Sequence, residues 1–156
     1  MTMKWTWAGA TAIGTAHQQS GAPCQDAFAC RVSRPSSGGE ILIAALADGA
    51  GSAERAEAGA RLATSIFVDV VRERFEEGDV SASQVSELVR FGVEAARVAV
   101  AATADHEDRE IDDFASTLLV AILNQWGRHR TDRRRRRCLL RRNRASLGTG
   151  AVARPW

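Results

Sequence analysis

The chain contains 156 residues, 45% of them hydrophobic and 26% charged, a composition that suits one folded domain and excludes a wholly disordered or fibrous protein. Its apolar runs fall far short of the ~18 residues that a membrane helix needs, and its first residues lack the apolar segment of a secretory signal. The three cysteines are scattered and form neither a disulfide framework nor a CxxC pair, so we expect a protein of the reducing cytoplasm.

The net charge of +2 conceals an asymmetry between two regions. Residues 125–156 contain eleven arginines and a single acidic residue, Asp132, whereas residues 1–124 are net acidic. The arginine-rich region shows neither a helical nor a strand period and has few apolar residues, so we predict a disordered tail. We therefore divide the chain into a folded region, residues 1–124, and this tail.

In the first third of the chain the apolar pattern predicts three strands. Loose alternation predicts a strand over Lys4–Gly14, and the polar residues 15–25, which include a glycine and a proline, predict a loop. Clearer alternation predicts a second strand over Asp26–Val32, followed by a turn at Ser33–Glu40. The continuous apolar run Ile41–Ala47 predicts a third strand, buried on both faces or on one face with small residues on the other.

Two helices and a last strand are predicted next. The first helix follows the glycine-rich turn after the third strand and ends at Gly78. Ser81, with Gln84 three residues later, resembles a capping box before the second helix, which fades near the acidic stretch Asp105–Asp113, interpreted as a solvated connector. The run Phe114–Leu123 predicts another buried strand. The apolar helix faces comprise Leu62, Ala63, Ile66, Phe67, Val70 and Val71, then Val85, Leu88, Val89, Gly92, Val93, Ala96, Ala99 and Val100.

The most informative position is Asp48-Gly49, where the buried apolar run stops. A buried strand delivers a carboxylate to its own end, the glycine permits a tight turn, and small residues follow. Hard divalent cations bind carboxylate and carbonyl oxygens at such a place. The alternative is a simple connection from strand to helix, with Asp48 as a cap on the helix side. Spacing alone favours this second interpretation.

Two other polar residues precede the second strand or begin it. Asp26 opens the strand, and carboxylates at the ends of neighbouring strands can share a pair of metal ions; alternatively, Asp26 is a surface turn residue. His17 is a candidate phosphate contact or general acid, although a single histidine in a loop is more often simply solvated. Cys24 has no base partner visible in the sequence, so we assign it no catalytic role.

Several segments, in order along residues 4–124, resemble the N-terminal part of the bacterial PPM-type (protein phosphatase 2C-like) serine/threonine phosphatases. The series QDA, ADGAGSA and ASTLL is fairly specific in combination, although each piece alone is weak. The matching segments are Trp7-Ala-Gly-Ala, Ile13-Gly-Thr-Ala-His17, Gly21-Ala-Pro-Cys-Gln-Asp-Ala27, Ile43-Ala-Ala-Leu-Ala-Asp-Gly-Ala-Gly-Ser52 with Gly59 in the next helix, and Ala115-Ser-Thr-Leu-Leu119.

The resemblance implies an α+β fold, namely an α-β-β-α sandwich of two antiparallel sheets flanked by helices, here incomplete. It implies a binuclear Mn²⁺ or Mg²⁺ centre between the sheets, where the bridging aspartate matches Asp48 and the backbone-carbonyl ligand matches Gly49. The acidic pair of the first motif falls on Gln25-Asp26. The implied reaction is hydrolysis of a phosphoprotein by a metal-activated water, without a covalent enzyme intermediate.

The chain departs from the family pattern in three ways. Gln25 is neutral where better-known members have glutamate, so we expect one metal to be held more weakly. The upstream phosphate-binding arginine has no counterpart, and Gly21 lies near its place, which leaves His17 as a candidate partial substitute. The later metal aspartates are missing, since Asp132 is the only aspartate after Leu123.

One hypothesis for the arginine run is a frameshift. A Gly-Asp-Gly motif in GC-rich DNA, read out of frame, encodes consecutive arginines, and Arg133–Arg137 lies about where the family carries such a motif. Two other interpretations stay open. The chain is a non-catalytic pseudophosphatase remnant, or its arginine-rich tail is a nucleic-acid-binding arm, because clustered arginines neutralise phosphates. We expect no membrane partner, and nucleic acid only through the tail.

Overall fold

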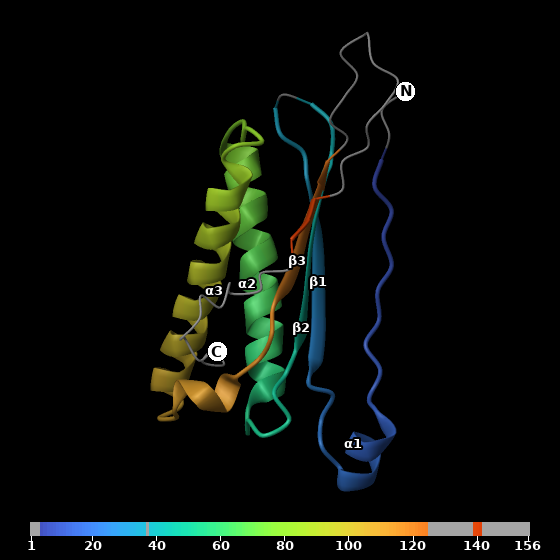
Figure 1. The fold of residues 1–156 in the computed structure, drawn as a ribbon, viewed down its shortest axis with the longest axis vertical. Helices are drawn as coiled ribbons and strands as arrows, with labels where there is room; N and C mark the ends of the chain where they lie inside the picture. The colour runs from blue at the N-terminus through green and yellow to red at the C-terminus, as the bar shows by residue number, and fades with distance from the viewer. Residues whose placement is uncertain (1–3, 37, 125–138, 142–156) are drawn as a thin grey trace, which may run out of the picture.

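The computed structural model describes residues 4–36, 38–124 and 139–141. Within them the chain forms a layer of two long helices packed on one antiparallel β-sheet (Figure 1). The elements are α1 (Thr15–Ser20), β1 (Asp26–Ser33), β2 (Ile41–Asp48), α2 (Ala56–Glu77), α3 (Val85–His106), the 3₁₀ helix η1 (Ile111–Phe114), β3 (Leu119–Asn124) and β4 (Leu139–Arg141).

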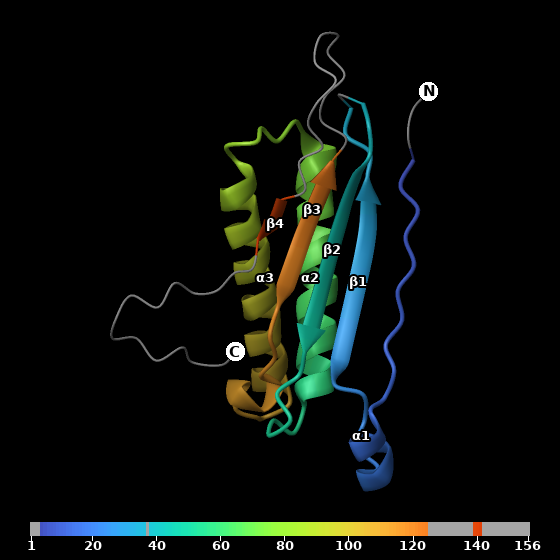
Figure 2. The same ribbon diagram turned by 45° about the vertical axis from the view of Figure 1, so that its right-hand side comes forward.

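The strands lie in the order β1-β2-β3-β4, and each pairs antiparallel with its neighbour. β1 and β2 form a hairpin, and β3 joins β2 only after the chain has passed through α2 and α3. Both long helices lie on the same face of the sheet, as the two side views show (Figures 1 and 2). α2 contacts the sheet directly. α3 lies on the far side of α2 from the sheet and packs against α2 and η1.

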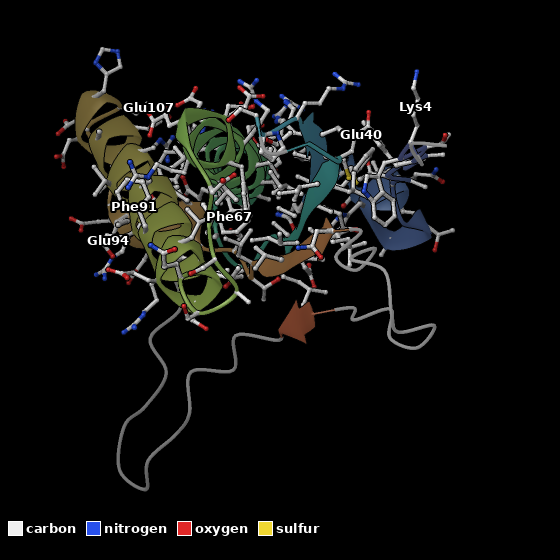
Figure 3. All side chains as sticks on the ribbon, turned by 90° about the horizontal axis from the view of Figure 1, so that it is seen from above. Lys4, Glu40, Phe67, Phe91, Glu94 and Glu107 are labelled. Atoms are coloured by element: carbon white, nitrogen blue, oxygen red, sulfur yellow. The ribbon has the colours of Figure 1, made fainter. Side chains whose placement is uncertain are left out.

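The core lies between α2 and the sheet. Phe67, Val68 and Val71 of α2 are fully buried against inward-facing residues such as Ile43. Phe67 and Val68 precede Val71 by four and three positions, so all three lie on one face of the helix. Removing a large apolar side chain from water contributes about 1.5–3 kcal/mol to folding, which makes this contact the main stabilising layer. Figure 3 shows Phe67 in this interior, whereas the ring of Phe91 on α3 lies 5.5 Å from the guanidinium of Arg74 on α2.

Gly92 lets α3 approach α2 closely. A Cβ at this position would lie 2.8 Å from Cγ2 of Val71 and 2.9 Å from the ring of Phe67. Beyond Gly92, the buried face of α3 continues through Ala96 and Val100, both small enough to keep the helices close. The predicted apolar face of α3 is therefore confirmed, and it ends further along the helix, at Ala104.

The sheet face that points away from the helices is also apolar. Phe28, Leu46 and Leu119 lie opposite one another on three adjacent strands, so they form a row across this face. Leu46 is 53% exposed and Leu119 is 36% exposed. The ring of Trp7 packs edge-on against Phe28, with ring centroids 6.2 Å apart. We call this surface, on the side opposite α2, the outer sheet face.

Several predicted elements are confirmed with small shifts. β1 and β2 match the predicted strands within one residue, and the two long helices end near their predicted limits. The predicted stripe on the first helix is confirmed in part, because Ala63, Phe67 and Val71 are buried whereas Leu62, Ile66 and Val70 are half-buried. Ser81 and Gln84 do interact: the Ser81 backbone N–H donates to Oε1 of Gln84 at 3.0 Å, but the helix itself begins at Val85.

Three predictions about the ends of the folded region are wrong. Lys4–Gly14 is extended but pairs with no strand of the described residues, because Trp5 bonds to Glu40 and Trp7 packs on a ring instead of joining a ladder. Residues 15–25 are not all loop, since they contain α1, which ends at Gly21 with the left-handed φ of 71° that glycine accommodates. The strand predicted to start at Phe114 starts at Leu119, because η1 and an extended connection come first.

The prediction of a disordered tail is wrong at Leu139–Arg141, which pair with β3 as β4; the rest of the tail lies outside the described residues. Among the described residues there is one sheet and not the expected two, so the α+β character is confirmed and the second layer is not. No helix in the described part of the chain is long and apolar enough to cross a membrane.

Candidate functional site

Two carboxylates meet at one end of the β1–β2 hairpin. Asp26 is the first residue of β1 and Asp48 is the last of β2, and the register places them directly opposite each other. Opposite residues of an antiparallel pair have Cβ atoms about 4.5–5.5 Å apart and point to the same face. Both side chains are exposed. The structure thus brings together the two aspartates that the sequence singled out.

Strand alternation explains why both carboxylates lie on the outer sheet face. Ala27 and Ala47, their neighbours along the strands, are buried against Ala60 of α2. Successive side chains of a strand point to opposite faces, so Asp26 and Asp48 point away from the helices. Small alanines on the inner side let α2 lie close to the sheet, and the acids on the other side keep their contact with water.

Gly49 is held tightly at the point where β2 ends. Its backbone N–H donates to the carbonyl of Gln25 at 3.1 Å. A Cβ at this position would lie 2.8 Å from that carbonyl oxygen and 2.9 Å from Cβ of Ala56, so glycine alone fits without displacing a neighbour. Gln25, half-buried, therefore lies against the Asp48-Gly49 turn, and its side-chain Oε1 is 3.9 Å from where a Cβ of Gly51 would stand.

A second segment fixes the backbone of Asp48. Thr117 donates its backbone N–H to the Asp48 carbonyl at 2.8 Å, and its Oγ1 accepts the Asp48 N–H at 3.1 Å. Gly49 also bridges Ser116, and Ala50 donates its N–H to the carbonyl of Ala115 at 2.8 Å. The sequence pointed to Ala115–Leu119 through the family resemblance but assigned it no role. Its role in the structure is to hold the turn that carries Asp48.

The interpretation of Asp48 as a helix cap is wrong. Helix α2 begins at Ala56, its N-terminal flanking residue is Arg55, and no side chain caps it. The residues between Asp48 and α2 form a turn that is bonded to the segment before β3. Asp48 is therefore free of a capping role and presents its carboxylate on the outer sheet face.

An ion-pair network lies next to this turn, where the sequence led us to expect a solvated connector. Arg109 contacts Glu54 at 2.7 Å, Asp113 at 3.6 Å and Glu107 at 3.9 Å, and Arg55 contacts Glu107 at 3.0 Å. The hydrogen bond from Arg109 to Glu54 is the main reason why the pKa of the guanidinium is raised. The acidic stretch is thus tied to the start of α2, and Figure 3 shows Glu107 beyond the end of α3.

The remaining candidates lie in α1, just before β1 and within β1. His17 lies in α1, half-buried, at the same end of the sheet as Asp26 (Figures 1 and 2). Cys24 and Cys30 are free thiols. Burial raises the pKa of the Cys30 thiol, an effect that Arg31 partly offsets, so Cys30 is protonated at neutral pH. A thiolate nucleophile at Cys30 is therefore disfavoured.

The donor set fits part of a divalent-cation site. Two carboxylates on one exposed face, next to a backbone turn, offer the oxygen ligands that Mg²⁺ and Mn²⁺ prefer. Within the described ranges, however, no cluster of three or more His, Cys, Asp or Glu side chains is arranged to hold a metal ion. The described residues therefore offer two carboxylates on one face, and a complete cation site would need further ligands.

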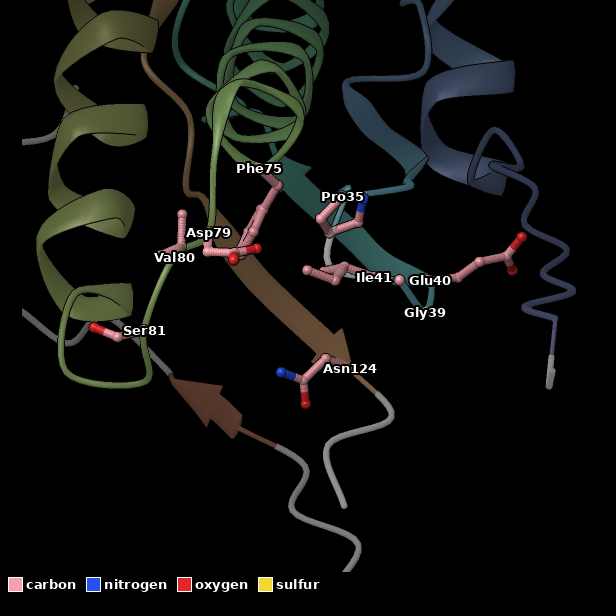
Figure 4. A pocket seen from close by; sticks show the side chains of 10 residues that line it. Pro35, Gly39, Glu40, Ile41, Phe75, Asp79, Val80, Ser81 and Asn124 are labelled. Carbon is pink, nitrogen blue, oxygen red and sulfur yellow. The ribbon is translucent and has the colours of Figure 1, made fainter. Parts of the chain in front are cut away.

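A cavity of about 310 Å³ lies at the opposite end of the sheet, between the hairpin turn and the α2–α3 connection (Figure 4). Glu40 is one of the lining residues, but its carboxyl group points away from the cavity and is bonded to Trp5 and Arg34 (Figure 4). The cavity is not the candidate site, because neither of the paired aspartates lines it. Its lining comprises Pro35, Gly38, Gly39, Glu40, Ile41, Phe75, Asp79, Val80, Ser81 and Asn124.

Comparison with known proteins identifies the family. Residues 13–130 match the family described as Protein phosphatase 2C, which is most of the chain. The chain therefore belongs to the protein phosphatase 2C family, as its sequence motifs predicted. It is also 29% identical, over 125 residues, to the serine/threonine-protein phosphatase 3 of Escherichia coli (strain K12).

That alignment covers 80% of this chain but only 49% of the relative, so the chain spans about half the length of the curated protein that it matches. No solved structure is significantly similar to it. Both acidic residues of the candidate site and the segment that holds Asp48 fall inside the family match.

Proposed function

We propose that this chain carries part of a metal-dependent phosphatase site that hydrolyses phosphomonoesters on serine or threonine side chains of phosphoproteins. The observation that carries the proposal is the register pairing of Asp26 with Asp48 on an exposed sheet face. Membership of the protein phosphatase 2C family and the name of the E. coli relative support the reaction class.

In this proposal the carboxylates of Asp26 and Asp48, the carbonyl oxygen of Gly49 and the side-chain oxygen of Gln25 hold Mn²⁺ or Mg²⁺ ions. Bound ions of this kind lower the pKa of a water and offset charge on phosphoryl oxygens. His17 is the proposed phosphate contact. Because the amide of Gln25 is neutral, it contributes no charge and holds its ion more weakly than a carboxylate would.

The chain's own residues prepare this end of the hairpin. The bonds from Thr117 fix the backbone of Asp48, and Gly49 keeps Gln25 beside it, so the ligand atoms are oriented before a cation binds. The outer sheet face has the apolar character of a surface that becomes buried. We propose that a second sheet packs there, completes the sandwich and brings further carboxylates, supplied by polypeptide corresponding to the rest of the relative.

Calorimetric titration of the full chain with Mn²⁺ tests the proposal. Wild type is expected to bind Mn²⁺, and Asp48→Asn is expected to weaken binding. The asparagine amide keeps an oxygen but lacks the negative charge that a hard cation prefers, so we expect a roughly ten- to hundredfold loss of Mn²⁺ affinity. The control is Asp79→Asn, which removes the same charge at the other end of the molecule and should leave binding unchanged.

Hydrolysis of p-nitrophenyl phosphate in the presence of Mn²⁺ is the second measurement. Turnover that disappears in Asp48→Asn supports a phosphatase. Mn²⁺ binding without turnover supports the non-catalytic interpretation, in which the chain retains the carboxylates but not the complete centre. If wild type and Asp48→Asn bind Mn²⁺ equally, the proposed site is wrong.

A further inference from the structure

We propose that Arg109 is a positioning residue for the carboxylate of Asp48, acting through the ion-pair network beside it. This inference rests on the proposed function, because it concerns the geometry of the same site. Arg109 is 61 residues away from Asp48 in the chain, and it touches neither aspartate of the pair in any described contact. Its effect has to pass through the backbone that it holds.

Arg109 joins both sides of the turn that follows β2. On one side it pairs with Glu54, at the end of that turn, at 2.7 Å. On the other side it pairs with Asp113, in η1, at 3.6 Å. The backbone N–H of Arg55 donates to the carbonyl of Asp113 at 2.8 Å, so the same two segments are also joined directly. The guanidinium therefore clamps the start of α2 to the segment that leads into β3.

That segment in turn holds Asp48. From Asp113 the chain runs through Ala115, whose carbonyl accepts the Ala50 N–H, to Thr117, whose N–H donates to the Asp48 carbonyl. The hydrogen bonds that join this segment to Arg55, Ala50 and Asp48 are each 2.8 Å long, which is close to the ideal length. A displacement of η1 would therefore move the backbone on both sides of Asp48. Arg55, over the ring of Phe114 with 6.0 Å to its centroid, stabilises the same end of η1.

The proposal predicts a change in Mn²⁺ affinity that is opposite in direction to the change expected from electrostatics alone. Replacing Arg109 with methionine removes a positive charge from an acidic region, and by Coulomb attraction alone this would strengthen Mn²⁺ binding. If Arg109 positions the carboxylate, the same substitution weakens Mn²⁺ binding instead. Residues that orient metal ligands through hydrogen bonds typically change metal affinity by roughly 10- to 100-fold, and a network one step further away should give about the lower end of that range.

The experiment measures Mn²⁺ affinity of the full chain for wild type, Arg109→Met and Arg31→Met, at 0.5 M salt to screen long-range charge. Arg31 is the matched control, because it pairs with Asp69 at 2.9 Å, joining β1 to α2, five residues along the strand from Asp26. Glu54→Gln serves as a milder variant, because it removes only the carboxylate that pairs with Arg109 at 2.7 Å. We expect Arg109→Met and Glu54→Gln to weaken binding and Arg31→Met to leave it unchanged, with equal far-ultraviolet circular dichroism.

Amide hydrogen exchange gives a readout that does not depend on metal. The amides of Ala50 and Thr117 should exchange faster in Arg109→Met than in wild type, and Arg31→Met should not change them. Unchanged exchange at both amides, or stronger Mn²⁺ binding by Arg109→Met, would overturn the positioning role. If wild type binds no Mn²⁺ but the amides respond as expected, the proposed function fails while the clamp by Arg109 stands.

Discussion

Single glycines determine how closely the elements around the candidate site approach one another. Gly59, in the first turns of α2, packs against the backbone of Phe114, and a Cβ there would overlap the Phe114 carbonyl oxygen. Because the obstacle is main chain and not a flexible side chain, a rotamer change cannot relieve the overlap. This contact sets the distance between α2 and η1, and through η1 it affects the segment that holds Asp48.

Gly59→Ala is therefore expected to destabilise the fold. Overpacking a tight interior contact costs about 1–3 kcal/mol, well above the helix-propensity gain of about 0.5–1 kcal/mol from glycine to alanine. Thermal unfolding followed by circular dichroism measures the difference. The matched control is Gly78→Ala, where a Cβ meets nothing within 4 Å and the φ of 179° is ordinary extended backbone. A melting temperature for Gly59→Ala at or above that of wild type would contradict the packing argument.

At the scale of elements, the N-terminal segment depends on one buried carboxylate. The Trp5 backbone N–H donates to Oε2 of Glu40 at 2.8 Å, the indole N–H of Trp5 donates to the Glu40 carbonyl at 3.0 Å, and Arg34 pairs with Oε1 at 3.0 Å. The hydrogen bond from Trp5 is the main reason why the pKa of Glu40 lies below its ordinary value of 4.5; burial opposes this effect, and Arg34 adds to it. The segment is thus attached to the hairpin through an ionised side chain.

The lowered pKa of Glu40 determines how the stability of the fold changes with pH. Glu40 loses its proton more readily in the folded than in the unfolded chain, so it stabilises the fold above pH 4.5 and this contribution disappears as pH falls below it. Glu40→Gln should therefore reduce the loss of melting temperature between pH 6 and pH 3.5. Glu87→Gln, an exposed glutamate on α3, is the control and should keep the wild-type slope. Equal slopes for Glu40→Gln and wild type would refute this role.

The elements that the sequence predicts well are those with a long repeating pattern. α3 presents a small or apolar residue to α2 at nearly every turn, so its face was predictable from spacing alone. η1 and α1 span only about one turn each, and a single turn carries too little periodicity to be recognised. Lys4–Gly14 alternates like a strand, yet its partners are Glu40 and Phe28, and no local pattern reveals such distant contacts.

For the whole molecule, the decisive feature is that both long helices cover the same face of the sheet. The opposite face keeps the row Phe28–Leu46–Leu119, in which Trp7 packs on Phe28 while Leu46 is 53% and Leu119 36% exposed. Contiguous exposed apolar surface of this kind promotes association or aggregation. We therefore expect the isolated chain to bind the dye ANS and to scatter light on concentration.

Replacing Leu46 and Leu119 together with lysine should lower both signals. Val98→Lys on α3 is the matched control, because Val98 is 60% exposed, more than either leucine, but lies on the helix layer and not in the row. If the outer sheet face causes the association, only the double substitution reduces dye fluorescence and scattering. An equal reduction by Val98→Lys would point to general surface hydrophobicity instead.

The part of the candidate site that lies at the ends of strands could be predicted from the sequence. Asp26 and Asp48 flank two strands that the sequence identifies, and an antiparallel hairpin necessarily brings such ends together. The roles of Thr117 and Arg109 were not predictable in this way. Both act across more than fifty positions of sequence, through a backbone bond in one case and an ion pair to Glu54 in the other. Such contacts depend on the tertiary arrangement and leave no local pattern.

Both paired carboxylates belong to one β-hairpin, so a single contiguous stretch, residues 25–49, contains all the cation ligands that we propose within this chain. Its loop, near Ser36, lies at the far end of the two strands from the acids. A reporter peptide inserted in this loop would therefore be separated from the ligands by the full length of the strands. A graft of this hairpin onto another scaffold would also need the segment Ala115–Thr117, because its hydrogen bonds hold the turn that carries Asp48.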